Sequence, residues 1–111
     1  KKFIVLYHAS KDAAEKMASA SPEEMKAGME PWMAWAKKCG SALVDFGTPL
    51  GNGKKVTKGG TVPSDKEVIG YSILEAANMD EAVKLLQGHP HLDWTDSCEI
   101  EVHESLPTPG M

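Results

Sequence analysis

The order in which strand and helix patterns follow one another is what most limits the fold of this 111-residue chain. Strands are predicted where β-branched, aromatic or alternating residues gather, at 1–9, 41–47, 67–76 and 98–104. Helical spacing and end signals predict the main helices at 21–40 and 78–88. The order strand–helix–strand–strand–helix–strand is typical of the ferredoxin-like α+β fold, βαββαβ. We therefore expect an antiparallel four-stranded sheet in the order fourth, first, third, second strand, with both helices on one face.

The ends of the helix at 21–40 are the most clearly marked in the sequence. Ser21 is the expected N-cap, Pro22 takes the first helical position, and Glu24 completes a capping box. Gly40 follows the last turn, where a helix commonly ends. Pro31 lies inside the helix and predicts a kink, because an interior proline costs about 3 kcal/mol.

Helical spacing also predicts which side of this helix is buried. The expected stripe consists of Met25, Met29, Trp32, Met33 and Ala36. Trp35 lies outside that stripe and is predicted at a dimer contact or under the long loop. That loop, at 48–66, is rich in glycine, proline and lysine, and we expect a small hairpin around residues 51–53. A shorter helix is predicted after Ser10, and Asn78 is the expected cap of the helix at 78–88.

Composition and charge are those of an ordinary globular chain, and we expect a single domain over 1–111. Hydrophobic residues make up 41% and charged residues 25% of the sequence. The net charge is −4 and the 12 basic residues are scattered, which argues against a nucleic-acid partner. No apolar run is long enough to span a bilayer, so no membrane partner is expected. Two cysteines without an export signal predict a cytoplasmic protein.

A sheet with helices on one face leaves its other face bare. The most common way to cover such a face is a second copy of the same chain, so the pattern predicts a homodimer. The alternative is a monomer with a solvated polar face, which antiparallel sheets tolerate.

The second half of the chain resembles a known family. The segment "GYSILEAANMDEAVKLLQGHPHL" followed by "CEIEVHESLP" is similar to the YCII-related domain, including its DGPF-type relatives. The segments "FIVLYHA" and "SALVDFGTPL" extend the resemblance over nearly the whole chain. It implies a dimeric α/β barrel, in a family most of whose members have no established reaction.

The resemblance also suggests where an acid–base pair would lie. Members closest to the family's namesake are thought to carry a histidine on the first helix and an aspartate on or near the second strand. Asp45 matches the aspartate position, but the helix at 21–40 contains no histidine. The imidazole must therefore come from elsewhere in this chain.

Strand directions suggest which side chains could supply that imidazole. His8 ends the first strand, and His89 follows the second main helix, so both should lie at one end of the sheet with Asp45 nearby. We predict His8, Asp45 and His89 as catalytic residues. His8 and Asp45 should stand about 10 Å apart at the backbone, so a ligand or water would bridge them. His103 is expected at the opposite end.

Four further polar residues are expected to contact the substrate. These are His91, Glu99, Glu101 and Tyr71. His89 and His91 alternate around Pro90 and could form a metal pair, but a third ligand is missing, so no metal is predicted. The alternative places them in a hydrated turn or at a helix C-terminus.

These features predict a small dimeric enzyme that uses acid–base chemistry, without a cofactor, on a small organic molecule. Elimination, hydrolysis and isomerisation are all compatible with such a site. The alternative is a non-catalytic dimer that binds a small molecule or serves as a scaffold.

Overall fold

The computed structural model describes residues 1–110 and confirms the predicted α+β class and sheet topology. The main sheet is antiparallel and four-stranded, in the order β2-β5-β1-β6, which is the predicted fourth–first–third–second order read from the opposite edge. Its strands are β1 (Lys2–His8), β2 (Leu43–Asp45), β5 (Val68–Glu75) and β6 (Glu99–Glu104). Only the second strand is much shorter than predicted.

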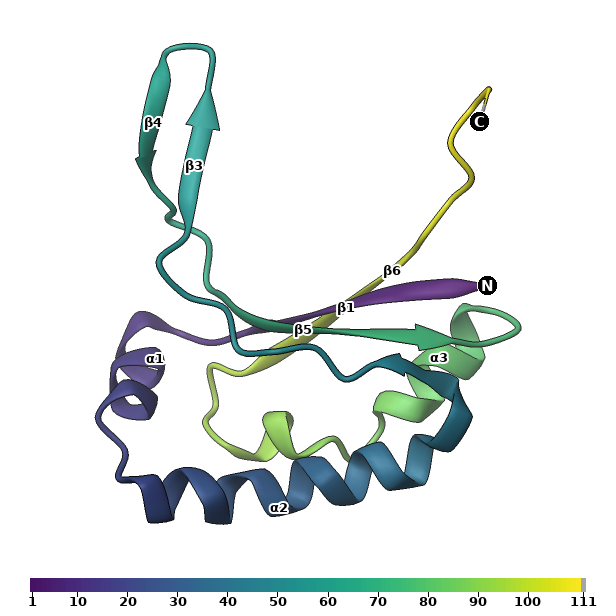
Figure 1. The fold of residues 1–111 in the computed structure, drawn as a ribbon, viewed down its shortest axis with the longest axis horizontal. Coiled ribbons are helices and arrows are strands. Elements are labelled where there is room, and N and C mark those ends of the chain that lie inside the picture. Colours follow the sequence, from purple (N-terminus) through teal and green to yellow (C-terminus); the bar gives the residue numbers. More distant parts are fainter. Residues whose placement is uncertain (111) are drawn as a thin grey trace.

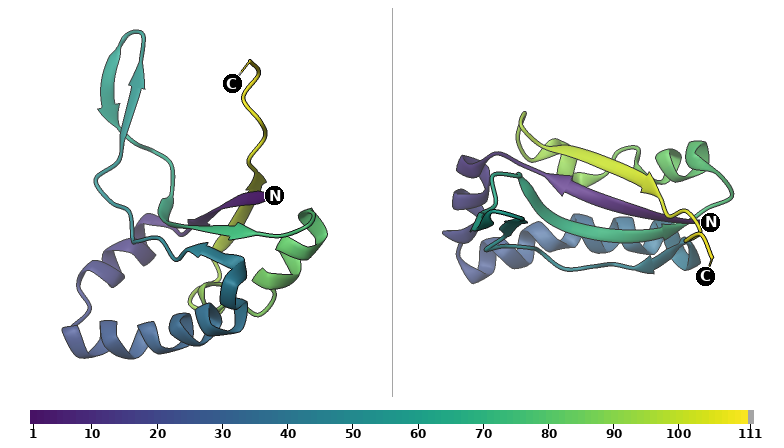
Figure 2. Two further views of the ribbon diagram at one scale, coloured as in Figure 1. Left: turned by 45° about the vertical axis from the view of Figure 1, so that its right-hand side comes forward. Right: turned by 90° about the horizontal axis from the view of Figure 1, so that it is seen from above.

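The main helices lie on one side of this sheet. They are α2 (Pro22–Cys39) and α3 (Met79–Leu86), accompanied by the 3-10 turns η1 (Gly40–Ala42) and η2 (Pro90–Asp93), while α1 (Lys11–Ala18) lies beside the end of β1. Figure 1 shows α2, α3 and η2 beneath the sheet, and Figure 2 shows the other face uncovered from above. We call these the helix-side face and the open face.

The predicted helix ends are confirmed. The Ser21 hydroxyl accepts from the Glu24 N–H, and the Glu24 carboxylate accepts from the Ser21 N–H, which completes the capping box. The Asn78 side chain caps α3 by accepting from the Glu81 N–H, and the Ser10 side chain caps α1 by accepting from the Ala13 N–H. Helix α2 continues through Pro31. This part of the helix is exposed, so water can reach the carbonyl that the proline leaves unpaired.

The predicted buried stripe of α2 is confirmed only at Trp32, which is half-buried and packs against the core, and is wrong for the methionines. Met25, Met29 and Met33 are 47%, 43% and 58% exposed, whereas Trp35 is only 4% exposed. The sheet lies over the C-terminal half of the helix, so Trp35 and Cys39 are the buried residues of α2, with Trp32 packed beside them. Spacing alone identified a helix with apolar residues around much of its circumference, and the position of the sheet decides which of them are buried.

The long loop forms a separate hairpin. Its strands are β3 (Lys54–Thr57) and β4 (Gly60–Pro63), so the turn falls at residues 58–59 and not at 51–53 as predicted. The hairpin and the C-terminal segment both rise on the open-face side of the sheet (Figure 1).

Candidate functional site

The register of the strands determines which side chains share the open face. Leu6 on β1 lies between Tyr71 on β5 and Glu101 on β6. One step along, Ile4 lies between Ile73 and His103. Paired residues of neighbouring strands project from the same face of a sheet. The open face therefore has an aliphatic floor with polar groups on both sides.

A third set of paired residues on the open face consists of His8 on β1 and Glu99 on β6. His8 is half-buried, and its Nε2 atom has no hydrogen-bond partner among residues 1–110. A buried polar atom without a partner is uncommon, so this nitrogen is a candidate to bind a ligand.

Asp45 reaches the open face because β2 contains a bulge. Leu43 pairs with Leu74 and packs against the core, whereas Asp45 pairs with Ile73 of the open face. Two residues on β2 thus span one step of β5, so Val44 is the extra residue. In a regular strand, Leu43 and Asp45 would share a face, and the bulge is what turns the carboxylate away from the core.

The Asp45 carboxylate is held at its new position by local contacts. Oδ1 accepts a 2.8 Å hydrogen bond from the Gly47 N–H, and Oδ2 lies 3.5 Å from the Tyr71 hydroxyl. Gly47 has φ +80°, and a Cβ at this position would stand 1.8 Å from the Tyr71 carbonyl oxygen. Only glycine allows this close approach of β2 to β5.

Glu101 and His103 form the shortest polar contact of the open face. His103 Nε2 lies 2.6 Å from Glu101 Oε1, and both side chains are more than half exposed in the single chain. The hydrogen bond from His103 lowers the pKa of Glu101, and the charges of His103 and His8 act in the same direction. An ionised carboxylate only accepts hydrogen bonds, so His103 donates from Nε2.

His89 and His91 lie at the same end of the sheet as His8, as expected, but on the helix-side face. His89 is 0% and His91 2% exposed, so the prediction of a hydrated turn is wrong. His91 Nε2 is 2.8 Å from the carbonyl oxygen of His8. The structure therefore brings Asp45, Tyr71, Glu101 and Glu99 onto one face with His8, and separates His89 and His91 from them. The predicted proximity of Asp45 to His8 is wrong, because Asp45 pairs with Ile73 and is level with Ile4, four residues along β1 from His8.

The surroundings of His89 are aromatic. Its ring is 4.5 Å from that of Trp32 and 4.4 Å from that of Trp35, in edge-on arrangements, and 5.1 Å from that of Tyr7. Its Nδ1 accepts a hydrogen bond from the His91 N–H. The neutral ring must therefore carry its proton on Nε2, and this atom has no hydrogen-bond partner among residues 1–110.

Burial lowers the pKa of His89 to about 4, and the nearby His91 adds to the effect. Burial also lowers the pKa of His91, against the opposing effect of its hydrogen bonds to the backbone of His8 and Glu99. Both imidazoles are neutral near pH 7. This part of the structure is suited to packing rather than to proton exchange with a ligand.

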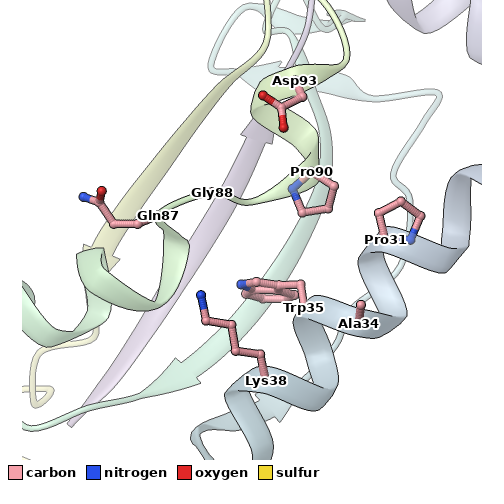
Figure 3. A pocket seen from close by; sticks show the side chains of 8 residues that line it. All are labelled: Pro31, Ala34, Trp35, Lys38, Gln87, Gly88, Pro90 and Asp93. Atoms are coloured by element: carbon pink, nitrogen blue, oxygen red, sulfur yellow. The ribbon is translucent and has the colours of Figure 1, made fainter.

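A hollow of about 320 Å³ lies between α2 and the segment from α3 to η2. Figure 3 shows Trp35 at its floor, with Lys38 and Asp93 at its margins. Its lining residues are Pro31, Ala34, Trp35, Lys38, Gln87, Gly88, Pro90 and Asp93. It contains none of the predicted site residues, and it is open to solvent rather than enclosed.

Residues 1–110 show neither a metal centre nor a membrane span. Within that range, no group of three or more His, Cys, Asp or Glu side chains is arranged to hold a metal ion. No helix in the same range is long and apolar enough to cross a membrane.

Comparison with known proteins supports the fold. No model of a known protein family matches the sequence, and no curated protein matches it. Among solved structures, the chain is similar to the 5-chloro-2-hydroxyhydroquinone dehydrochlorinase of Burkholderia phenoliruptrix, determined in complex with 2,5-dihydroxybenzoquinone. The similarity covers 96% of this chain and 94% of the other, with a TM-score of 0.57 and 14% sequence identity. The two proteins share a ferredoxin-like fold.

The candidate residue that sequence reasoning missed is His103. Strand direction placed it at the far end of the sheet, and its pairing with Ile4 agrees with that. Its side chain, however, reaches back along β6 to Glu101. The signal was present in the sequence, because Glu99, Glu101 and His103 alternate and must share one face.

Proposed function

We propose that this protein is a YCII-related enzyme that works as a homodimer and carries out acid–base chemistry on a small organic molecule held on the open face. The observation that carries the proposal is the short Glu101–His103 contact on a face that the helices leave uncovered. A second copy packed on this face would enclose the pair, and exclusion of water strengthens such interactions.

The floor of the open face suggests the shape of the substrate. Leu6 lies between Tyr71 and Glu101, and two strand spacings place the backbones of these flanking residues about 10 Å apart. A flat, hydroxylated ring could lie on Leu6 and make hydrogen bonds on both sides. The similar dehydrochlorinase, determined with 2,5-dihydroxybenzoquinone, supports this choice of substrate class.

The open-face residues can be given separate roles. His103, oriented by Glu101, is the proposed base, and His8 is the second proton carrier. Asp45 and Tyr71 orient the substrate from the other side. Glu99 lies beside His8 at the margin of the site. His89 and His91, first expected in the site, support β1 from beneath through the His91–His8 contact.

The test is turnover of a panel of hydroxylated and chlorinated rings, beginning with 5-chloro-2-hydroxyhydroquinone and measuring chloride release. With a substrate found, His103→Asn and Glu101→Gln should each lower kcat by about 100-fold or more. Glu104→Gln is the matched control, because Glu104 is a carboxylate on the same strand and its pairing with the buried Phe3 places it on the other face.

Two results would contradict the proposal. A wild-type protein that stays monomeric at micromolar concentration would remove the enclosed site. Full activity of Glu101→Gln on a substrate turned over by wild type would remove the proposed base. Asp45→Asn should lower activity while the dimer remains.

A further inference from the structure

The β3–β4 hairpin stands apart from the rest of the chain. Every residue from 51 to 63 is exposed, and Figures 1 and 2 show the hairpin rising beyond the open face. The radius of gyration is 15.4 Å. A compact domain of this length has a radius of about 13 Å. Figure 1 shows that the hairpin and the C-terminal segment project from the rest of the chain.

This hairpin presents apolar side chains to solvent on both of its faces. Val56 pairs with Thr61 and Val62 pairs with Lys55, so the two valines project on opposite sides. They are 76% and 49% exposed. An isolated two-stranded hairpin is at best marginally stable in water. The hairpin would therefore gain stability from a surface that packs against it.

The hairpin and the open face carry opposite charges. Lys54, Lys55 and Lys58 lie on the hairpin, and Lys55 is 3.5 Å from Asp65 of the same chain. Among residues 1–110, the other two lysines have no carboxylate within 4 Å. The open face instead gathers carboxylates: by strand register, these are Asp45, Glu75, Glu99 and Glu101, against the single lysine Lys2.

We infer that each hairpin is an arm that crosses to the second copy and places Lys54 and Lys58 against the carboxylates at the margin of that copy's open face. The inference rests on the dimer of the proposed function. The opposite charges of the arm and the open face favour a second copy of this chain as the partner of the arm. In a two-fold dimer, each copy offers one acidic open face to the arm of the other.

The arm is long enough for this contact. The Leu50 N–H bonds to the Ile69 carbonyl oxygen at the base of the arm, and Lys58 is at its tip. That stretch of chain spans about 26 Å when extended, whereas two packed sheets are about 10 Å apart. The arm can therefore pass the interface and reach Glu75 or Glu99 of the second copy.

Two charge-reversal variants, measured separately and as a mixture, test the inference. One variant reverses the arm, Lys54→Glu with Lys58→Glu, and the other reverses the margin, Glu75→Lys with Glu99→Lys. Each should weaken the dimer about tenfold or more, as measured by sedimentation velocity across a concentration series. An equimolar mixture should recover the wild-type association, because both arm contacts in the mixed dimer again pair opposite charges.

Two further variants make the measurement specific. Lys37→Glu with Lys38→Glu, on α2, reverses the same amount of charge away from the open face and should leave the dimer unchanged. Replacing residues 54–63 with a short Gly-Ser linker removes the arm and should weaken the dimer at least as much as charge reversal does. Circular dichroism and the urea midpoint verify that each variant is folded.

The outcomes separate this inference from the proposed function. Arm and margin variants that dimerise like wild type would overturn the arm contact and leave the open-face dimer in place. Weakened variants that do not recover on mixing would also overturn it, since the contact would then not join two chains. A monomeric wild type would overturn both proposals.

Discussion

The two faces of this sheet hold histidines in opposite environments. On the helix-side face, His89 lies between indole rings, fully buried, with burial holding its pKa at about 4. On the open face, His103 is exposed and hydrogen-bonded to a carboxylate. The same side chain can therefore act as a neutral packing group or as a proton carrier, depending on which face of one sheet it occupies.

The largest expected effect concerns the buried side chains of the helix-side face. Trp35→Ala removes a buried ring from His89 and the 2.8 Å hydrogen bond from its Nε1 to the Leu85 carbonyl oxygen. We expect a loss of about 3–5 kcal/mol in the free energy of unfolding. Trp94, at 39% exposure, is the matched control, and Trp94→Ala should cost less than about 1 kcal/mol. Urea denaturation measures both losses, and equal losses would contradict the burial of Trp35.

The next effect is the loss of stability in acid. Unfolded His89 takes up a proton near 6.5, the usual pKa of histidine, but folded His89 does so only at about 4. The unfolded state binds more protons between these values, so stability falls as pH drops from about 6.5 to 4, by up to about 3 kcal/mol. His91, with its pKa also lowered by burial, acts in the same direction.

A histidine substitution on each face isolates this contribution. His89→Gln should reduce the dependence of unfolding free energy on pH over that interval, with the contribution of His91 remaining, whereas His103→Gln should leave the dependence as in wild type. An unchanged slope in His89→Gln would show that the acid sensitivity arises elsewhere.

A smaller effect is expected from the buried hydrogen-bond chain beneath the sheet. Tyr7 Oη lies 2.8 Å from Ser72 Oγ, which donates to the Phe46 carbonyl oxygen at 2.7 Å. Ser72 has one proton to donate, so Tyr7 must be the donor in the first contact. Tyr7→Phe leaves Ser72 without that donor and should cost about 1 kcal/mol, measured by urea denaturation. Tyr71→Phe on the open face should change stability by less than about 0.5 kcal/mol.

The same variants can be compared by absorbance titration of the phenols. Burial raises the pKa of Tyr7 to about 12. Tyr7→Phe should therefore abolish the most alkaline phenol transition, and Tyr71→Phe should retain it. Loss of that transition in Tyr71→Phe instead would contradict the burial of Tyr7.

The sequence predicted the frame of the molecule because its signals are local. The Ser21 capping box, the Asn78 cap and the alternation of β6 each depend on a few neighbouring residues, and all are confirmed. The burial of Trp35 in place of Met29 depends on where the sheet lies over α2, which spacing along the helix does not encode. Local patterns therefore determined the elements but not every contact between them.

The site was predicted only in part for a similar reason. His8 and Asp45 were singled out, and both lie on the open face, although their roles there remain predictions. Asp45 faces that way because of a bulge at Val44, which depends on pairing with β5. His89 was assigned by its position after α3, but the side of the sheet it occupies is decided by packing against Trp32 and Trp35.

The smallest expected effect on stability concerns the exposed pair of Glu101 and His103. It tests whether the open face differs from the helix-side face in function rather than in stability. His103→Asn removes the main group that lowers the pKa of Glu101, so that pKa should rise toward its usual value. A carboxyl with a lowered pKa adds stability above its unfolded pKa and loses it as pH falls through the folded pKa. Because the pair is exposed and screened in the single chain, the free energy of unfolding should stay unchanged within error.

NMR titration of the Glu101 side chain, in dilute protein, measures the shift in its pKa. A pKa that does not move in His103→Asn would mean that the 2.6 Å contact is not maintained in solution, and the open face would then have no oriented base.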